Sequence, residues 1–415
     1  MDKDTTKSTF NKVLNQFPIK KFNSLVKENG SDEYVKKLFT IKLLYLLVFA
    51  QITQVESLRT LAKKVKNDVE LQENLELDSI SFSQLSRRLS DIDSDFWGTM
   101  FTHVAKDVMQ KTVGTTPSAE RIHIIDASTI TLCLSSYKWA DYRKTKAGVK
   151  LHQCLVYDKD NDNAYPDKAI LTTARKSDKS QLDELLIIDS NALYVFDRGY
   201  VDYKKWDDYC EAGIRFVTRI KDNFIINTID DTPVDGTNMT ESIVILGDLN
   251  TTMMRNKLRL IHTVDTTGSP VVILTNDFSI RTQEVSEIYR LRWKVELFFK
   301  WIKQHLKVKK FFGKSLNAVY TQIWIALITF CLLQLLTRVT LKVKNSLLDI
   351  QQLIKDNMFK PFENILEILR KQPTRTSYGR RKTEDYNWQF EQLLTEIKYG
   401  DTKFLDSYDL ELNYL

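Results

Sequence analysis

The sequence has few cysteines and no apolar leader. Its 415 residues include four cysteines, none in a CxxC or other metal-ligand spacing: Cys133, Cys154, Cys210 and Cys331. We interpret them as buried thiols of a reducing compartment. The N-terminal stretch MDKDTTKSTFNKVLNQF lacks the apolar core of a signal peptide, which argues against export and favours the cytoplasm.

A long apolar run is also missing. The most apolar segment, Ile323 to Leu336, lies between Gln322 and Thr337 and falls short of the roughly 20 residues that cross a bilayer. It predicts a buried core helix and no membrane partner. The five histidines show no metal-ligand spacing, so we interpret all five as structural or near DNA. His152 is of most interest, because KLHQCL predicts a core strand.

Acidic residues are absent between Glu296 and Asp349, although the whole chain carries a net charge of only +6. Lysines crowd the start of this stretch: Lys300, Lys303, Lys307, Lys309, Lys310 and Lys314. Such a run is typical of a surface that binds a polyanion. The alternative is a solvated basic face of a helix.

Residues 1–115 predict a helical N-terminal domain, because apolar residues recur at helical spacing in VKKLFTIKLLYLLVFAQITQ and in SLRTLAKKV. Two short amphipathic segments follow, with Ser81 and Ser83 as candidate N-caps and Arg87 and Arg88 expected to be exposed. This pattern resembles a helix-turn-helix that places one helix in a DNA groove. Simple packing of a helical pair is the alternative.

After the linker VGTTPSAE the composition changes, and residues 120–340 predict an α/β domain. Strands are expected in IHIIDASTITLCL, GVKLHQCLVYD and KAILTTA, then a helix and the strand ALYVFDRGY. Residues 212–277 predict a β-rich insertion that stays separate from the central sheet. Long helices are expected at 282–309 and 318–336, and residues 341–415 predict a helical C-terminal region with a basic loop at 370–385.

Two aspartates follow apolar strand segments. Asp126 ends IHIID, where Ala127 to Thr129 are expected to turn the chain, and Asp197 ends ALYVFD. Carboxylates at the ends of buried strands are costly unless they are paired or bound to a cation, so the two invite a metal site. For either aspartate alone, capping of a turn is an equal alternative.

A third carboxylate lies on a predicted helix with several polar neighbours. At about 100° per residue, Tyr289, Arg292, Glu296 and Lys303 fall within a wedge of about 60°, and Lys300 and Lys307 lie on the same side. Such a face suits a metal ion held against a phosphodiester, with Arg and Lys binding the phosphates. An exposed i,i+4 ion pair between Arg292 and Glu296 is the alternative.

The segment YRLRWKVELFFKWIK resembles the Y-(2)-R-(3)-E-(6)-K signature of DDE transposases from the bacterial insertion-sequence-four family, with IIDAST and FDRGY similar to the contexts of its two aspartates. The resemblance covers about residues 122–312. It implies that Asp126, Asp197 and Glu296 form the catalytic, metal-binding triad. The predicted fold class is therefore α/β with an RNase H-like catalytic core, a β-rich insertion, and helical N-terminal and C-terminal regions.

The resemblance also implies a chemistry. Three carboxylates would hold two Mg²⁺ or Mn²⁺ ions, which oxygen ligands favour over zinc. Tyr289, Arg292 and Lys303 would bind terminal phosphates, with weaker backbone contacts from lysines such as Lys300 and Lys307. The expected partner is double-stranded DNA, both terminal inverted repeats and target, bound by a homodimer at the bacterial nucleoid. The alternatives are an RNase H-like nuclease without strand transfer and a catalytically inactive DNA-binding relative.

Overall fold

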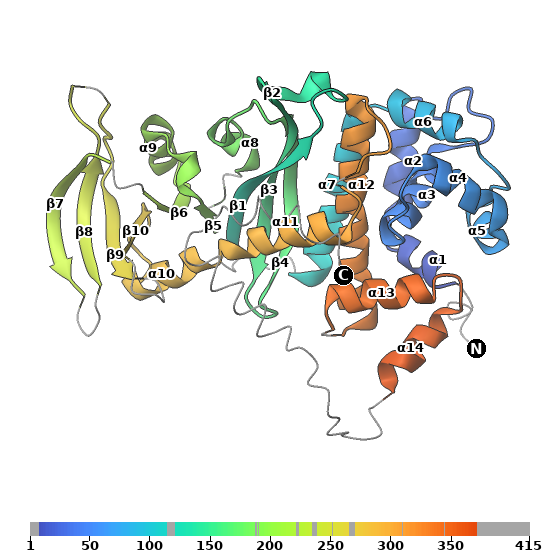
Figure 1. Ribbon diagram of the computed structural model, residues 1–415. Coiled ribbons are helices and arrows are strands. Elements are labelled where there is room, and N and C mark those ends of the chain that lie inside the picture. Colours follow the sequence, from blue (N-terminus) through green and yellow to red (C-terminus); the bar gives the residue numbers. More distant parts are fainter. Residues whose placement is uncertain are drawn as a thin grey trace, which may run out of the picture.

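The computed structural model describes residues 8–113, 121–186, 189, 191–220, 224–234, 239–250, 252–264, 270–308, 310–343 and 345–371. One large sheet occupies the middle and one end of the molecule, and helices cover its faces and form the other end (Figure 1). The architecture is mixed α/β, as the sequence predicts. The linker at 114–120 and most of the predicted basic loop lie outside the described residues.

The N-terminal part is helical. Its helices are α1 (Thr9–Leu14), α2 (Ile19–Glu28), α3 (Thr40–Ile52), α4 (Leu58–Asn67), α5 (Val69–Leu75), α6 (Phe82–Asp91) and α7 (Ser94–Thr112). Ser81 caps α6 in a capping box with Gln84, as predicted, whereas Ser83 lies inside the helix. Arg87 is exposed. The prediction of an exposed Arg88 is wrong, because its guanidinium donates to Thr40 Oγ1 and pairs with Asp32.

The sheet has ten strands: β1 (Arg121–Leu132), β2 (Asp141–Arg143), β3 (Lys146–Asp158), β4 (Asn163–Thr173), β5 (Ala192–Phe196), β6 (Arg215–Arg219), β7 (Ile226–Pro233), β8 (Thr240–Leu246), β9 (Leu258–Val264) and β10 (Pro270–Thr275). Their order is β2-β3-β1-β5-β6-β10-β9-β8-β7, and β4 pairs with β3. Strands β1, β5 and β6 run parallel, while β3 and β4 are antiparallel to their neighbours. This arrangement puts β1 and β5 at the centre, where both faces are covered.

Side chains of β1 and β5 alternate between two apolar layers, as the pleat of a strand requires. On one face, Ile125 and Phe196 pack with the short helix α8 (Leu182–Leu185) and with α9 (Tyr203–Glu211). On the other face, Ile124 packs with α11 (Trp293–His305), and Val195 packs with α10 (Thr282–Arg290). The two faces of the same strands therefore have different surroundings.

The β-rich content of residues 212–277 agrees with the sequence, but their separation from the central sheet does not. Strand β6 is itself a central strand, and β10 pairs with it antiparallel, Thr275 opposite Val217. Strands β9, β8 and β7 then continue the same sheet. An unpaired edge on β6 would expose its backbone groups, so this segment extends the sheet instead of forming a separate layer.

The single helix predicted at 282–309 is two helices, α10 and α11. Leu291 and Arg292 keep helical dihedrals, but Leu291, Arg292, Lys294 and Val295 each donate their N–H three residues back. The turn between the helices is therefore wound more tightly than an α-helix. Helix α11 ends at His305, so Lys307 lies beyond it and its predicted position on the helix face is wrong.

The apolar segment is a core helix, as predicted. Helix α12 (Leu316–Gln334) continues into a π-helical stretch, Leu335–Leu341, and this combined span passes the length and composition test for a membrane helix. Its most apolar window is entirely buried, and α12 packs against α7, α3 and α6. The N-terminal helices and the end of the 120–340 region thus share one core, which α13 (Leu347–Asp356) and α14 (Phe362–Arg370) complete.

Candidate active site

Two strand positions bring the first two carboxylates to the same edge of the parallel ladder. The last residue pair between β1 and β5 is Ile125 with Phe196, and Asp126 and Asp197 come directly after it. Asp197 follows the end of β5, as predicted. The predicted turn after Asp126 is wrong, because β1 continues to Leu132 through its antiparallel pairing with β3.

The pleat directs both aspartates to the same face of the sheet. Ile125 and Phe196 belong to the layer under α8 and α9. The next residue on each strand alternates to the opposite face, where α10 and α11 lie. Asp197 keeps an extended backbone, with φ −79° and ψ 164°, so the alternation continues through it.

Arg292 joins the sheet to the helix. Its Nη1 lies 3.6 Å from Asp126 Oδ2 and donates to Glu296 Oε1. The side chains of Arg292, Asp126 and Glu296 are 11%, 21% and 22% exposed, so the Arg292–Glu296 pair is not the exposed surface pair that was the alternative. Carboxylates 170 positions apart in the sequence thus meet at one guanidinium.

The three carboxylates influence one another electrostatically. Burial raises the pKa of Asp126 to about 7; Arg292 opposes this rise, and Glu296 and Asp197 add to it. Burial also raises the pKa of Glu296, with Arg292 opposing and Asp197 adding. One guanidinium therefore does not balance the negative charge of this group.

Tyr289 completes the surroundings of Arg292. It is 8% exposed on α10, and the Arg292 guanidinium carbon lies 6.0 Å from its ring centroid and 4.8 Å from that of Trp293. Burial raises the pKa of Tyr289 to about 12. Burial acts to lower the pKa of Arg292, but Tyr289 and the carboxylates outweigh it and raise that pKa.

The lysines extend away from this group along α11. Lys300 and Lys303 are half-buried and lie about 6 Å and about 10 Å from Glu296 along the helix axis, from the 1.5 Å rise per residue. Burial lowers the pKa of Lys300. Lys307 follows the helix and is held by its backbone, since its N–H donates to Gln51 and its carbonyl accepts from Gln322.

The donor set fits divalent cations that prefer oxygen. Asp126 and Glu296 offer carboxylate oxygens around Arg292, the charge of Asp197 acts on both, and both have pKa values raised by burial. A divalent cation would offset the cost of burying these carboxylates, which is the main cause of the raised pKa values. The sequence did not reveal a second cluster, His123 with Cys154 and Asp167, on the other face of the sheet.

Comparison with known proteins gives consistent matches. The family model described as "Transposase DDE domain" matches residues 117–332, and one described only as a domain of unknown function matches residues 5–75. A putative transposase of Sinorhizobium fredii is 31% identical over 258 residues, which cover 61% of this chain and 70% of the relative. A probable insertion-sequence transposase of Geobacillus stearothermophilus is 27% identical over 267 residues, covering 64% of this chain and 69% of the relative.

Among solved structures, the piggyBac transposase synaptic complex with hairpin DNA is similar, with a TM-score of 0.39 and 13% sequence identity. The likeness covers 81% of this chain and 73% of that one.

Proposed function

This chain belongs to the DDE-domain transposases of bacterial insertion sequences, and we propose that it cleaves the ends of an insertion sequence and joins them to target DNA. In this proposal Asp126, Asp197 and Glu296 are the catalytic triad. The observation that carries it is the meeting of Asp126 and Glu296 at Arg292, with Asp197 next to Asp126 in the strand register.

The assignment to the insertion-sequence-four family rests on residues of α10 and α11. The spacing of the insertion-sequence-four signature is kept by Tyr289, Arg292, Glu296 and Lys303. Tyr289 and Glu296 both lie beside the Arg292 guanidinium. The strand order β4-β3-β1-β5-β6, with β1, β5 and β6 parallel, supports an RNase H-like core. The strands β7 to β10 are then the insertion that precedes Glu296.

When bound, two Mg²⁺ or Mn²⁺ ions would activate water or a 3′-hydroxyl and stabilise the leaving oxygen. The carboxylates of Asp126, Asp197 and Glu296 would hold them, the first two positioned by the sheet and the third by the packing of α11. Arg292, released from its pairing with the carboxylates, would donate two parallel hydrogen bonds to a phosphate. Tyr289, predicted to bind a phosphate itself, is 8% exposed and would instead hold that guanidinium in place.

The DNA partner would be double-stranded, first the terminal inverted repeats and then the target. Lys303 would bind a backbone phosphate beside the reacting one, with Lys300 and Lys307 as weaker contacts. We assign the N-terminal helices of residues 1–115 to DNA binding, through exposed Arg87 of α6, and expect a homodimer in the DNA complex. The region 120–340 would be the catalytic domain, with α13 and α14 as a helical extension. Residues 372–415 of the predicted helical C-terminal region lie outside the described residues.

The deciding experiment measures joining as well as cutting. Inverted repeats in the DNA that flanks the gene supply the substrate, and precleaved ends are incubated with a supercoiled plasmid in Mg²⁺. Joined products support a transposase. Cutting without joining would indicate an RNase H-like nuclease, and specific binding without either reaction would indicate a catalytically inactive relative.

A further inference from the structure

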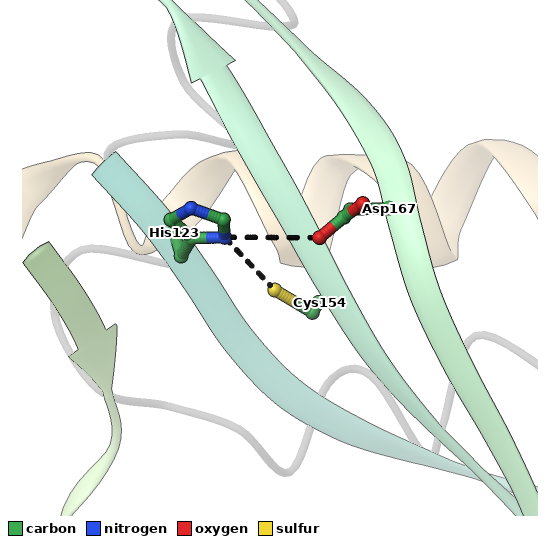
Figure 2. A group of neighbouring side chains, drawn as sticks. All are labelled: His123, Cys154 and Asp167. Atoms are coloured by element: carbon green, nitrogen blue, oxygen red, sulfur yellow. Dashed lines mark hydrogen bonds and ion pairs between the residues drawn. The ribbon is translucent and has the colours of Figure 1, made fainter. Parts of the chain in front are cut away.

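Three side chains from neighbouring strands meet on the face of the sheet opposite Asp126. Figure 2 shows Cys154 of β3 and Asp167 of β4 directed at the same ring nitrogen of His123 on β1. Cys154 Sγ lies 3.6 Å and Asp167 Oδ2 lies 3.9 Å from His123 Nδ1. All three ligand atoms lie within 4.8 Å of one another.

The strand register creates this meeting. Ile125 pairs with Cys154 and His123 pairs with Val156, so His123 and Cys154 are diagonal neighbours on one face. Cys154 pairs with Lys168 while Leu155 pairs with Pro166, which leaves Asp167 as the extra residue of a β-bulge. A bulge of this kind redirects a side chain, here toward His123.

The distance between His123 and Cys154 suits a tetrahedral metal ion, and Asp167 Oδ2, which lies 3.9 Å from His123 Nδ1, would move to about 3.3 Å on binding. Zn–N bonds of about 2.0 Å and Zn–S bonds of about 2.3 Å place nitrogen and sulfur ligands about 3.5 Å apart in a tetrahedron, close to the observed 3.6 Å. A hydrogen-bonded Cys–His–Asp relay needs its thiol and carboxylate on opposite ring nitrogens. Here both partners face Nδ1, which is the arrangement of ligands around one ion.

The surroundings of Asp167 also favour a bound cation. Asp167 is 22% exposed at its side chain, and no described Lys or Arg forms an ion pair with it. Its neighbour His123 is 5% exposed. Among the described residues, Asp167 thus has no cationic side chain in direct contact, and Lys168 and Arg121 offset its burial only from a distance.

We propose that His123, Cys154 and Asp167 bind one Zn²⁺ ion, with water as the fourth ligand. Thiolate and imidazole ligands favour Zn²⁺ over Mg²⁺, so this site is chemically distinct from the three carboxylates. The ion would fasten β1, β3 and β4 together, three residues from Asp126 on β1. Its role would be to fix the strand that carries the first catalytic carboxylate.

Cobalt tests this proposal, because a Co²⁺–thiolate bond absorbs in the near ultraviolet. The full chain is stripped with a chelator, excess Mg²⁺ is added to occupy the carboxylates, and Co²⁺ is titrated. We expect one equivalent to give the sulfur-to-cobalt band, Zn²⁺ to displace it, and Zn²⁺ to raise the melting temperature. Cys154→Ser should lose the band, whereas Cys133→Ser should keep it, because the Cys133 thiol is exposed and not buried as the sequence predicts.

Asp167→Asn provides a second test if Cys154→Ser does not fold. Asparagine has the size of aspartate, and the side chain at this position is partly exposed. It should weaken Zn²⁺ binding about tenfold or more, the range seen when a metal site loses a supporting group. A folded wild-type chain without the cobalt band, or Asp167→Asn with unchanged affinity, would overturn the proposal. Glu296→Gln should bind Zn²⁺ normally, so failure of the transposase assignment would leave this result intact.

Discussion

Asp126 and Asp197 occupy equivalent positions on two neighbouring parallel strands, each directly after the residue pair Ile125 and Phe196. Their relative placement therefore depends on backbone hydrogen bonding in the centre of the sheet. Glu296 differs, because it reaches the site through packing of α11 on the sheet. Two of the carboxylates are set by register and the third by helix packing.

Changing Glu296→Gln should separate chemistry from DNA binding. Glutamine keeps the size and hydrogen bonding of glutamate but removes the charge that a divalent ion needs. Cleavage in Mg²⁺ should fall by at least about 10²-fold, the scale of losing one transition-state contact, while gel-shift binding of the element's ends persists. Glu287→Gln, at an exposed position of α10, is the matched control; normal cleavage by Glu296→Gln would remove Glu296 from the triad.

Asp126→Asn should stabilise the metal-free chain, and more so at high pH. Burial raises the pKa of Asp126 to about 7 in the folded chain, against an ordinary value of 3.8. The folded state thus favours the protonated carboxyl, and wild-type stability falls as pH rises from about 4 to about 7. The melting-temperature advantage of Asp126→Asn in chelator should grow between pH 5 and pH 8.

Saturating Mg²⁺ gives the control for that measurement. It should raise the melting temperature of the wild type at pH 8 and have little effect on Asp126→Asn, because the ion needs the ionised carboxylate. A pH-independent difference between the two proteins would show that Asp126 is not held in the surroundings described here.

Lys303→Ala should weaken DNA binding without changing the metal site. A plot of the logarithm of the binding constant for the element's ends against the logarithm of salt concentration has a negative slope. Removing one phosphate contact should reduce the magnitude of that slope by roughly 0.9, because each phosphate contact releases about that share of counterions. Lys355→Ala, an exposed lysine of α13, should leave the slope unchanged. Equal slopes for wild type and Lys303→Ala would assign Lys303 to a structural role.

Local patterns were enough to predict some parts of the site. Apolar runs before Asp126 and Asp197 predicted central strands, and helical spacing predicted that Arg292 and Glu296 are neighbours. These features depend only on residues close in the chain. The core position of α12 was predicted for the same reason, since most of its residues are apolar.

The remaining features of the fold and the site depend on contacts between residues far apart in the sequence, so local patterns did not predict them. The sequence LRWKV contains no Gly or Pro, so nothing local marks the tight turn at Arg292. The continuation of β1 beyond Asp126 depends on β3, and the extension of the sheet depends on β10 pairing with β6. His123 and Cys154 meet only through register, and Asp167 only through a bulge in β4.

Arg259→Lys should show that the inserted strands position the helix of the site. The Arg259 side chain is 5% exposed and donates to both Glu241 oxygens, at 2.6 and 2.9 Å. It also donates to the carbonyls of Asp277 and Ile280 just before α10, and Thr282 at the start of α10 donates to Glu241. This network ties β8 and β9 to the helix that carries Tyr289.

An ammonium cannot reproduce that fork of donors, so Arg259→Lys leaves buried acceptors without partners. We expect urea unfolding to show a loss of about 3 kcal/mol, the lower end for breaking a buried ion pair, because Glu241 is 22% exposed. Cleavage should fall as well, although the triad is intact. Arg281→Lys, whose side chain is 85% exposed beside Glu284, should cost less than about 1 kcal/mol. If the two variants were equally stable and active, the inserted strands would not anchor α10.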